Sequence, residues 1–192
     1  DDEVMFPYTP EDRNFYSTDA FTQHALNFLN QYGPEDRPFL LYLAHAAPHF
    51  PMQAWPQDIA RYQGRYMIGW DELRKRRYQR LVEMGLIDKQ WGISDRDDIC
   101  PEWGRETDRK RYDRKMAVYA AMIDRMDQGI GKVLDKIREL GKEENTLVLF
   151  LSDNGGCGEN LDNSPEREPG SVDTYTTVDA PWANASNTPF RK

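Results

Sequence analysis

The stretch that decides the fold of this chain is Thr146–Gly156, with the sequence TLVLFLSDNGG. Its apolar core, Leu147 to Leu151, predicts a strand that is buried on both faces of a sheet. The residues that follow are polar or glycine, so they end the strand at a turn. Ligands of open α/β sheets bind beyond the carboxyl ends of strands. Asp153 and Asn154 therefore stand where a binding site is expected.

A carboxylate next to a carboxamide supplies two oxygen atoms that suit a hard cation such as Ca²⁺ or Mg²⁺. Gly155 and Gly156 would let the backbone turn sharply and let a ligand come close. The alternative is a plain exit from a strand, in which Asp, Asn and Gly are common for conformational reasons. Calcium needs roughly six to eight oxygen ligands, so other segments would have to complete the site.

A second apolar run, FLLYLA at residues 39–44, predicts another buried strand, and the loop AAPHFP at residues 46–51 follows it. His49 lies between two prolines that stiffen this loop. An imidazole there can donate to an anionic substrate or act as an acid or base near neutral pH. The alternative is a surface histidine or one with a structural hydrogen bond. His45 comes at a strand end and is compatible with a core position.

Helices are predicted around these strands from apolar spacing and from capping residues. Their expected ranges are 18–32, a short piece from Pro56 towards Tyr62, 71–84, and 107 to about 140. Residues 157–192 have no periodicity and predict a loop-rich region. Helices alternating with buried strands predict an α/β fold with crossover helices. Two strands alone do not make a stable sheet.

Composition argues against several classes of protein and also bears on whether the chain is part of a longer protein. The chain has 192 residues with 33 acidic and 25 basic side chains, a net charge of −8, which argues against nucleic-acid binding. The basic run Arg74–Arg77 is expected to be a solvated helix face. No uncharged apolar stretch is long enough for a membrane span. The mean hydropathy of −0.85 is low for an independent core. Together with a first residue that is not Met, it leads us to expect a piece of a longer protein.

Two cysteines, Cys100 and Cys157, set no disulfide framework. Unpaired thiols are the simpler reading, and one bridge is the alternative in an oxidising compartment.

Four segments, in this order, resemble the arylsulfatases of the sulfatase family. They are 38–51 (PFLLYLAHAAPHFP), 119–131 (YAAMIDRMDQGIG), 145–156 (NTLVLFLSDNGG) and 182–191 (WANASNTPFR). The resemblance covers nearly the whole chain. It implies the alkaline-phosphatase-like α/β sandwich, with residues 1–192 as the middle portion of a catalytic domain and 157–192 as an active-site region.

The resemblance also implies a reaction, the hydrolysis of a sulfate monoester. Asp153 and Asn154 would be two of the Ca²⁺ ligands, and His49 would contact the sulfate and assist the leaving oxygen. In the family a formylglycine, made from Cys or Ser in a Cys/Ser-x-Pro-x-Arg motif, attacks sulfur. The family occurs in the periplasm, the lysosome and the cytoplasm, so the compartment stays open. The oligomeric state is also open.

The chain departs from the family pattern at the nucleophile. Neither Ser164-Pro165-Glu166-Arg167 nor Cys100-Pro101-Glu102-Trp103 has the spacing of the formylglycine motif. Asp1-Asp2 lacks the strand that precedes the family's first pair of metal ligands, and the family's lysine would fall just past Lys192. We therefore expect this chain to be inactive alone.

Two alternative functions stay open. One is a non-catalytic module, derived from a sulfatase, that binds sulfated ligands. The other is a hydrolase of the same superfamily that acts on phosphate esters.

Overall fold

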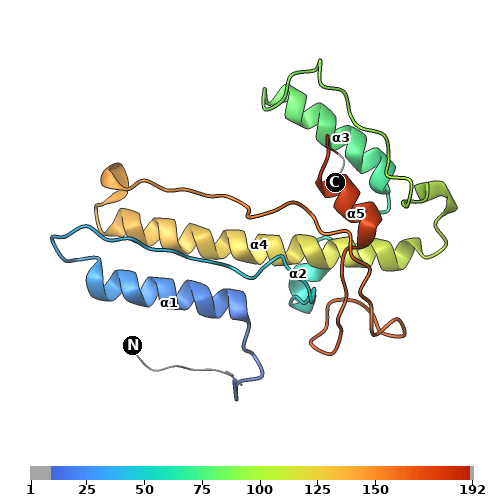
Figure 1. The fold of residues 1–192 in the computed structure, drawn as a ribbon. Helices are drawn as coiled ribbons and strands as arrows, with labels where there is room; N and C mark the ends of the chain where they lie inside the picture. The colour runs from blue at the N-terminus through green and yellow to red at the C-terminus, as the bar shows by residue number, and fades with distance from the viewer. Residues whose placement is uncertain (1–9, 191–192) are drawn as a thin grey trace. The chain divides into compact units, whose positions relative to one another are not determined.

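The structure of the chain is a computed structural model that describes residues 10–190. In that part of the chain there are five α-helices and two short 3-10 helices (Figure 1). Their bounds are α1 Ser17–Tyr32, α2 Pro56–Ala60, α3 Trp70–Glu83, η1 Trp103–Arg105, α4 Arg109–Glu139, η2 Glu143–Asn145 and α5 Asp179–Ser186. Asp1-Asp2 and Lys192, which are compared above with the family's metal ligands and lysine, lie outside the described residues.

The four helices expected from apolar spacing are confirmed. Helices α1, α2, α3 and α4 each begin and end within about two residues of the predicted range. Gly85 and Gly141, which follow the predicted ranges 71–84 and 107 to about 140, have φ of 70° and 66°. Glycine adopts this left-handed conformation without steric cost, which explains why both helices end there. No helix within residues 10–190 is both long and apolar enough to cross a membrane.

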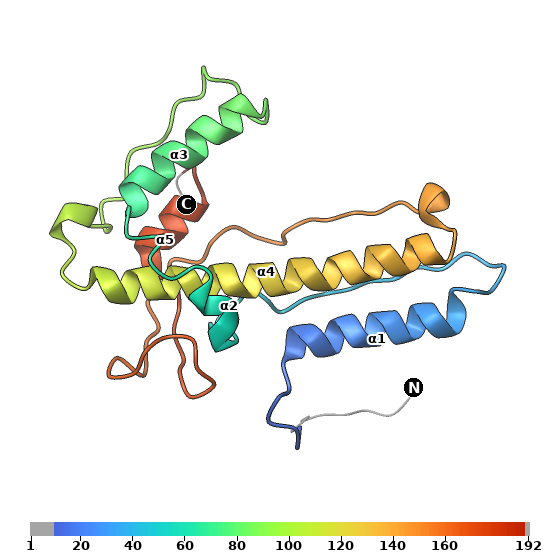
Figure 2. The same ribbon diagram turned by 180° about the vertical axis from the view of Figure 1, so that it is seen from behind.

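The predicted sheet is not confirmed. Residues 38–46 and 147–151 are extended but form no ladder, as Figure 2 shows by ribbons without arrows. The side chains of residues 147–151 are exposed, Phe150 to 76%. In the first segment Leu40 is 94% exposed, whereas Leu41 and Leu43 are partly buried against an apolar core cluster. Within the described residues the one bridge pairs Gln53 with Gly170 in parallel. A strand needs neighbouring strands to pair its N–H and C=O groups, and none lies beside either segment within residues 10–190.

The chain divides into two compact units. The first comprises residues 10–46 and 125–146, where α1 packs on the second half of α4. Ala25, Leu29, Val133 and Ile137 form its core. A Cβ at Gly129 would lie 2.3 Å from Oγ1 of Thr22, so the helices approach closely at that glycine.

The second unit comprises residues 47–124 and 147–190, and its core is built on tryptophan. Trp70 and Trp182 are fully buried, with ring centroids 5.4 Å apart at an interplanar angle of 86°. Each indole N–H has a partner: Trp70 Nε1 donates to the Pro101 carbonyl (2.8 Å) and Trp182 Nε1 to the Tyr112 carbonyl (3.0 Å). Edge-to-face pairs with satisfied N–H groups are a stable way to bury large aromatic rings.

Helix α5 lies in the region expected to consist of loops, so that expectation needs a correction. Asp179 and residues 181–185 of this helix are all buried. A helix that is buried on most sides has no polar face opposite an apolar one. It therefore lacks the periodicity by which α1, α3 and α4 are recognised.

The basic run 74–77 is also only partly the solvated face that was expected. Arg76 is exposed and pairs with Glu72 at 2.8 Å. Arg74, in contrast, is 5% exposed, and its Nη2 donates to the Ser94 carbonyl (2.7 Å) and to Ser94 Oγ (3.0 Å). Burial lowers the pKa of the Arg74 guanidinium. The buried Arg74 side chain thus connects α3 to the loop at residue 94 by hydrogen bonds.

Candidate functional site

The turn that carries Asp153 and Asn154 is held by local hydrogen bonds. Ser152 Oγ donates to the Asn154 carbonyl (2.7 Å), and Asn154 Nδ2 donates to the Gly155 carbonyl (2.8 Å). Both Asp153 and Asn154 are exposed. With Nδ2 engaged, Oδ1 is the side-chain atom of Asn154 that could face a ligand. Exposed carboxylate and carboxamide oxygens fit a hard cation chemically, although two such groups do not complete a calcium site.

His49 is also exposed and has a defined tautomer. Its Nδ1 lies 2.6 Å from the Phe50 carbonyl oxygen, and its ring stacks obliquely on that of Phe50 with centroids 4.3 Å apart. Because a carbonyl only accepts, Nδ1 carries the proton. The Nε2 atom is then the one that can accept or deliver a proton. The peptide bonds before Pro48 and Pro51 are both cis.

Contacts between these three residues are not seen in the described part of the chain. No hydrogen bond or ion pair joins His49 to Asp153 or Asn154 there. Within residues 10–190, no three His, Cys, Asp or Glu side chains are grouped so as to hold a metal. The sequence-based site therefore stays a prediction.

A cavity of about 320 Å³ adjoins the turn, and sequence reasoning did not find it. Its walls come from the loop at 97–100, from the residues after the turn and from α5. The lining residues are Asp97, Ile99, Cys100, Gly156, Gly158, Glu159, Ala180, Ala183, Asn184 and Asn187. Asn184 is 6% exposed, and neither polar atom of its carboxamide has a hydrogen-bond partner. No periodicity marks these residues, because three separate segments supply them.

No disulfide joins the two cysteines; Cys100 is buried and Cys157 is exposed. Of the two readings left open by the sequence, the structure has the one without a disulfide bridge.

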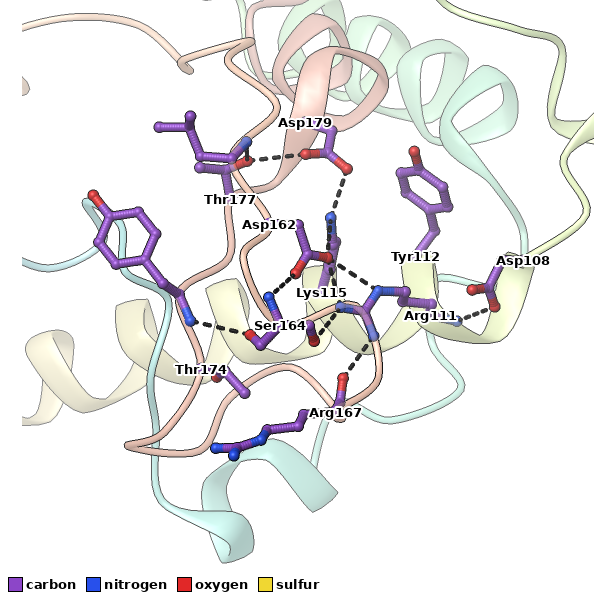
Figure 3. A network of polar contacts seen from close by, with 12 residues as sticks. Asp108, Arg111, Tyr112, Lys115, Asp162, Ser164, Arg167, Thr174, Thr177 and Asp179 are labelled. Carbon is purple, nitrogen blue, oxygen red and sulfur yellow. Dashed lines mark hydrogen bonds and ion pairs between the residues drawn. The ribbon is translucent and has the colours of Figure 1, made fainter.

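A buried polar network fixes the start of α5 (Figure 3). Lys115 Nζ on α4 lies 2.6 Å from Asp179 Oδ2 and 3.5 Å from Asp162 Oδ2. Arg111 Nη2 donates to the same Asp162 oxygen at 2.5 Å, and Thr177 Oγ1 donates to Asp179 Oδ1 at 2.9 Å. Both cations and both carboxylates are paired, which is typical of an anchor that holds loop and helix together.

The network shifts the pKa of its members. Burial would raise the pKa of the Asp162 carboxyl, but the hydrogen bonds from Arg111 and from the Ser164 N–H, with the charge of Lys115, lower it overall. Burial, assisted by the nearby Asp179 carboxylate, raises the pKa of the Tyr112 phenol. Asp162 therefore stays ionised, and Tyr112 stays neutral, at physiological pH.

Comparisons with known proteins identify sulfatases that are similar to this chain. The family model described as Sulfatase matches residues 2–190. An uncharacterized sulfatase of Schizosaccharomyces pombe is 34% identical over 93% of this chain and 35% of its own length. An arylsulfatase of Klebsiella aerogenes is 32% identical over 94% of this chain and 41% of its own length. This chain thus spans about two fifths or less of these two relatives.

A more distant relative points to the wider group. A multifunctional alkaline phosphatase superfamily protein of Trinickia caryophylli is 27% identical over 74% of this chain. That similarity agrees with an alkaline-phosphatase-like α/β fold. With a family match over nearly all residues and two relatives above 30% identity, the chain belongs to the sulfatase family.

Proposed function

We propose that the full-length protein hydrolyses sulfate monoesters and depends on calcium, with Asp153, Asn154 and His49 in its active site. The observation that carries this proposal is the family match over residues 2–190, which includes both candidate site segments. Two further facts support it. Asp153 and Asn154 are exposed on one turn, and the backbone contact of the exposed His49 is made by Nδ1 and not by Nε2.

Asp153 and Asn154 would supply two of the oxygen ligands of the cation. When bound, Ca²⁺ would act as a Lewis acid that stabilises negative charge on the sulfate. The chemistry of His49 follows from its tautomer. Its Nδ1–H donates to the Phe50 carbonyl, so in the neutral ring Nε2 is an acceptor. Once Nε2 has taken up a proton, the imidazolium would donate it to a sulfate oxygen or deliver it to the leaving oxygen.

The exposed apolar segments fit the same proposal. Residues 39–44 and 147–151 would be strands of the alkaline-phosphatase-like sheet, paired with strands contributed by the rest of the protein. Residues 147–151 are exposed, and Leu40 and Tyr42 of the first segment are 94% and 88% exposed. This exposure supports a missing partner, because apolar runs of this length are seldom left in water. Residues 1–192 would form the middle of the catalytic domain, and residues 157–192 a part of its active-site region.

The chain alone is proposed to be inactive. Its 192 residues contain no Cys-x-Pro-x-Arg or Ser-x-Pro-x-Arg motif from which a formylglycine could be made. Without a nucleophile, binding groups alone give little turnover.

Hydrolysis of 4-nitrophenyl sulfate by the full-length protein tests the function, with 4-nitrophenyl phosphate assayed in parallel. We expect sulfate hydrolysis that a chelator abolishes and added Ca²⁺ restores. Asp153→Ala should lose most of this activity, and the control Asp173→Ala, at an exposed aspartate, should keep it. Calcium-independent turnover, unchanged turnover in Asp153→Ala, or a preference for the phosphate ester would contradict the proposal. Binding of sulfated ligands without hydrolysis would favour the non-catalytic module.

A further inference from the structure

We infer that Asn187 is a positioning residue that holds the turn bearing Asp153 and Asn154 in one backbone conformation, so that both side chains are prepared to bind a cation. This inference rests on the proposed function, because it assigns the purpose of the contact to the proposed metal ligands. The contact itself is a feature of the second unit alone.

The carboxamide of Asn187 engages both backbone groups of Gly156. The Gly156 N–H donates to Asn187 Oδ1 at 2.7 Å, and Asn187 Nδ2 donates to the Gly156 carbonyl at 3.0 Å. The Asn187 side chain thus pairs with both the N–H and the C=O of one residue, as the backbone of a neighbouring strand would. Because both peptide planes that flank Gly156 are fixed, the path of the chain is set two residues beyond Asn154.

The two glycines of the turn serve this contact. A Cβ at Gly155 would lie 2.6 Å from Asn187 Oδ1, and one at Gly156 would lie 3.2 Å from the Cβ of Ser186. Neither glycine is among those with positive φ. The sequence motif DNGG was expected to need glycine for a sharp turn and for a close ligand. The structure adds a further reason for glycine here, the close approach to the end of α5.

The backbone of Asn187 is held in place by α5. Asn187 is the C-cap of α5, and its N–H donates to the Ala183 carbonyl at 2.9 Å. The other end of α5 is anchored by the buried pair of Lys115 and Asp179. The Phe190 N–H donates to the Asn187 carbonyl at 3.0 Å, which fixes the chain beyond the helix. We call the pair of hydrogen bonds between the Asn187 side chain and Gly156 the clamp. Because Asn187 is fixed at the end of a buried helix, the clamp fixes the exposed turn relative to that helix.

The physical consequence concerns the affinity for a cation. Asp153 and Asn154 are exposed and lie on a short turn that ends in two glycines. Without a clamp, binding a cation would have to order this turn, and the lost conformational freedom would weaken binding. Residues that orient metal ligands from outside typically change metal affinity about 10- to 100-fold when they are replaced.

Calcium binding to the full-length protein, measured by isothermal titration calorimetry, tests the inference. Asn187→Ala should raise the Kd for Ca²⁺ about tenfold or more. The control Asn160→Ala, at an exposed asparagine in the next loop, should leave the Kd unchanged. Asn187→Asp keeps the acceptor for the Gly156 N–H and loses the donor. It should give an intermediate Kd, and it serves as the test if Asn187→Ala fails to fold.

A double variant separates the clamp from general destabilisation. Gly155→Ala alone should weaken Ca²⁺ binding, because its Cβ would meet Asn187 Oδ1. In the Asn187→Ala background that oxygen is gone, so adding Gly155→Ala should cause little further loss. Additive losses, or an unchanged Kd in a folded Asn187→Ala protein, would overturn the inference.

Amide hydrogen exchange in the same proteins distinguishes this inference from the proposed function. The Gly156 amide should be protected in the unsubstituted protein and should exchange at least tenfold faster in Asn187→Ala. A Gly156 amide that exchanges freely in the unsubstituted protein would overturn the clamp while leaving a calcium-dependent sulfatase intact. An unsubstituted protein that binds no Ca²⁺ would overturn the proposed function, and the purpose assigned to Asn187 with it.

Discussion

The ammonium group of Lys115 on α4 lies 2.6 Å from the carboxylate of Asp179, the first residue of α5, and each side chain is 4% exposed. Asp179 has a φ of 63°, a left-handed conformation that non-glycine residues seldom adopt. The ion pair and the hydrogen bond from Thr177 hold Asp179 in this conformation. The start of α5 therefore depends on a contact between residues 64 positions apart in the sequence.

Lys115→Met should strongly destabilise the protein, because it leaves the Asp179 carboxylate buried without its main partner. Removing one member of a buried pair typically costs about 3–5 kcal/mol in the free energy of unfolding. Denaturant titration followed by tryptophan fluorescence measures this loss. The matched control is Lys110→Met, at an exposed lysine on the same helix, for which we expect a change within about 0.5 kcal/mol. Equal effects of the two variants would show that the pair contributes nothing.

Asp162→Asn should change how stability depends on pH. The folded-state pKa of Asp162 is lowered from its ordinary value of 3.8 by the net effect of its contacts. A lowered pKa contributes stability that is fully present well above pH 3.8 and is lost as the pH falls through the folded-state pKa. Asp162→Asn should therefore be less stable than the unsubstituted protein near pH 7, and the difference should shrink in acid. A difference that is constant with pH, in parallel denaturant titrations, would contradict this assignment.

Two glycines of α4 should respond in opposite ways to alanine. A Cβ at Gly129 would meet Thr22 Oγ1 at 2.3 Å, so Gly129→Ala should push α1 and α4 apart and lower the melting temperature. A Cβ at Gly131 would meet nothing within 4 Å, so Gly131→Ala should stabilise the helix by about 0.5–1 kcal/mol. Thr22→Ala combined with Gly129→Ala should recover part of the loss. A stabilising Gly129→Ala would disprove the close approach at this position.

His49→Ala should lower turnover of a sulfate ester by the full-length protein about 10²- to 10⁴-fold, the usual range for an acid–base group. The control is His24→Ala, at an exposed histidine on α1. Steady-state kinetics separate the possible roles of His49. A fall in kcat supports proton transfer, and a rise in KM with unchanged kcat would mark His49 as a binding residue only.

The amphipathic helices were predictable because their pattern is local. Each of α1, α3 and α4 buries one stripe of side chains, so apolar residues recur every three or four positions. Their ends were predictable at Gly85 and Gly141, because backbone sterics at a glycine depend on few neighbours. Asp153, Asn154 and His49 stood out because each follows an apolar run, and their family role followed from resemblance alone.

Long-range features were not predictable in this way. Helix α5 is buried on most sides, so its sequence shows no periodicity. Arg74 looked like a surface cation in the sequence, although it is buried and donates to the Ser94 carbonyl. The extended segments at 39–44 and 147–151 have the composition of strands, but a strand forms only where another strand pairs with it.

The sequence by itself determined helices α1 to α4, the position of the Asp153–Asn154 turn and the membership of the sulfatase family, because local pattern and similarity carry that information. Only the tertiary structure decided that Lys115 anchors α5 and that Asn187 clamps Gly156. The physical reason is that hydrogen bonds and ion pairs depend on distances between side chains, and residues far apart in the sequence acquire those distances only when the chain packs.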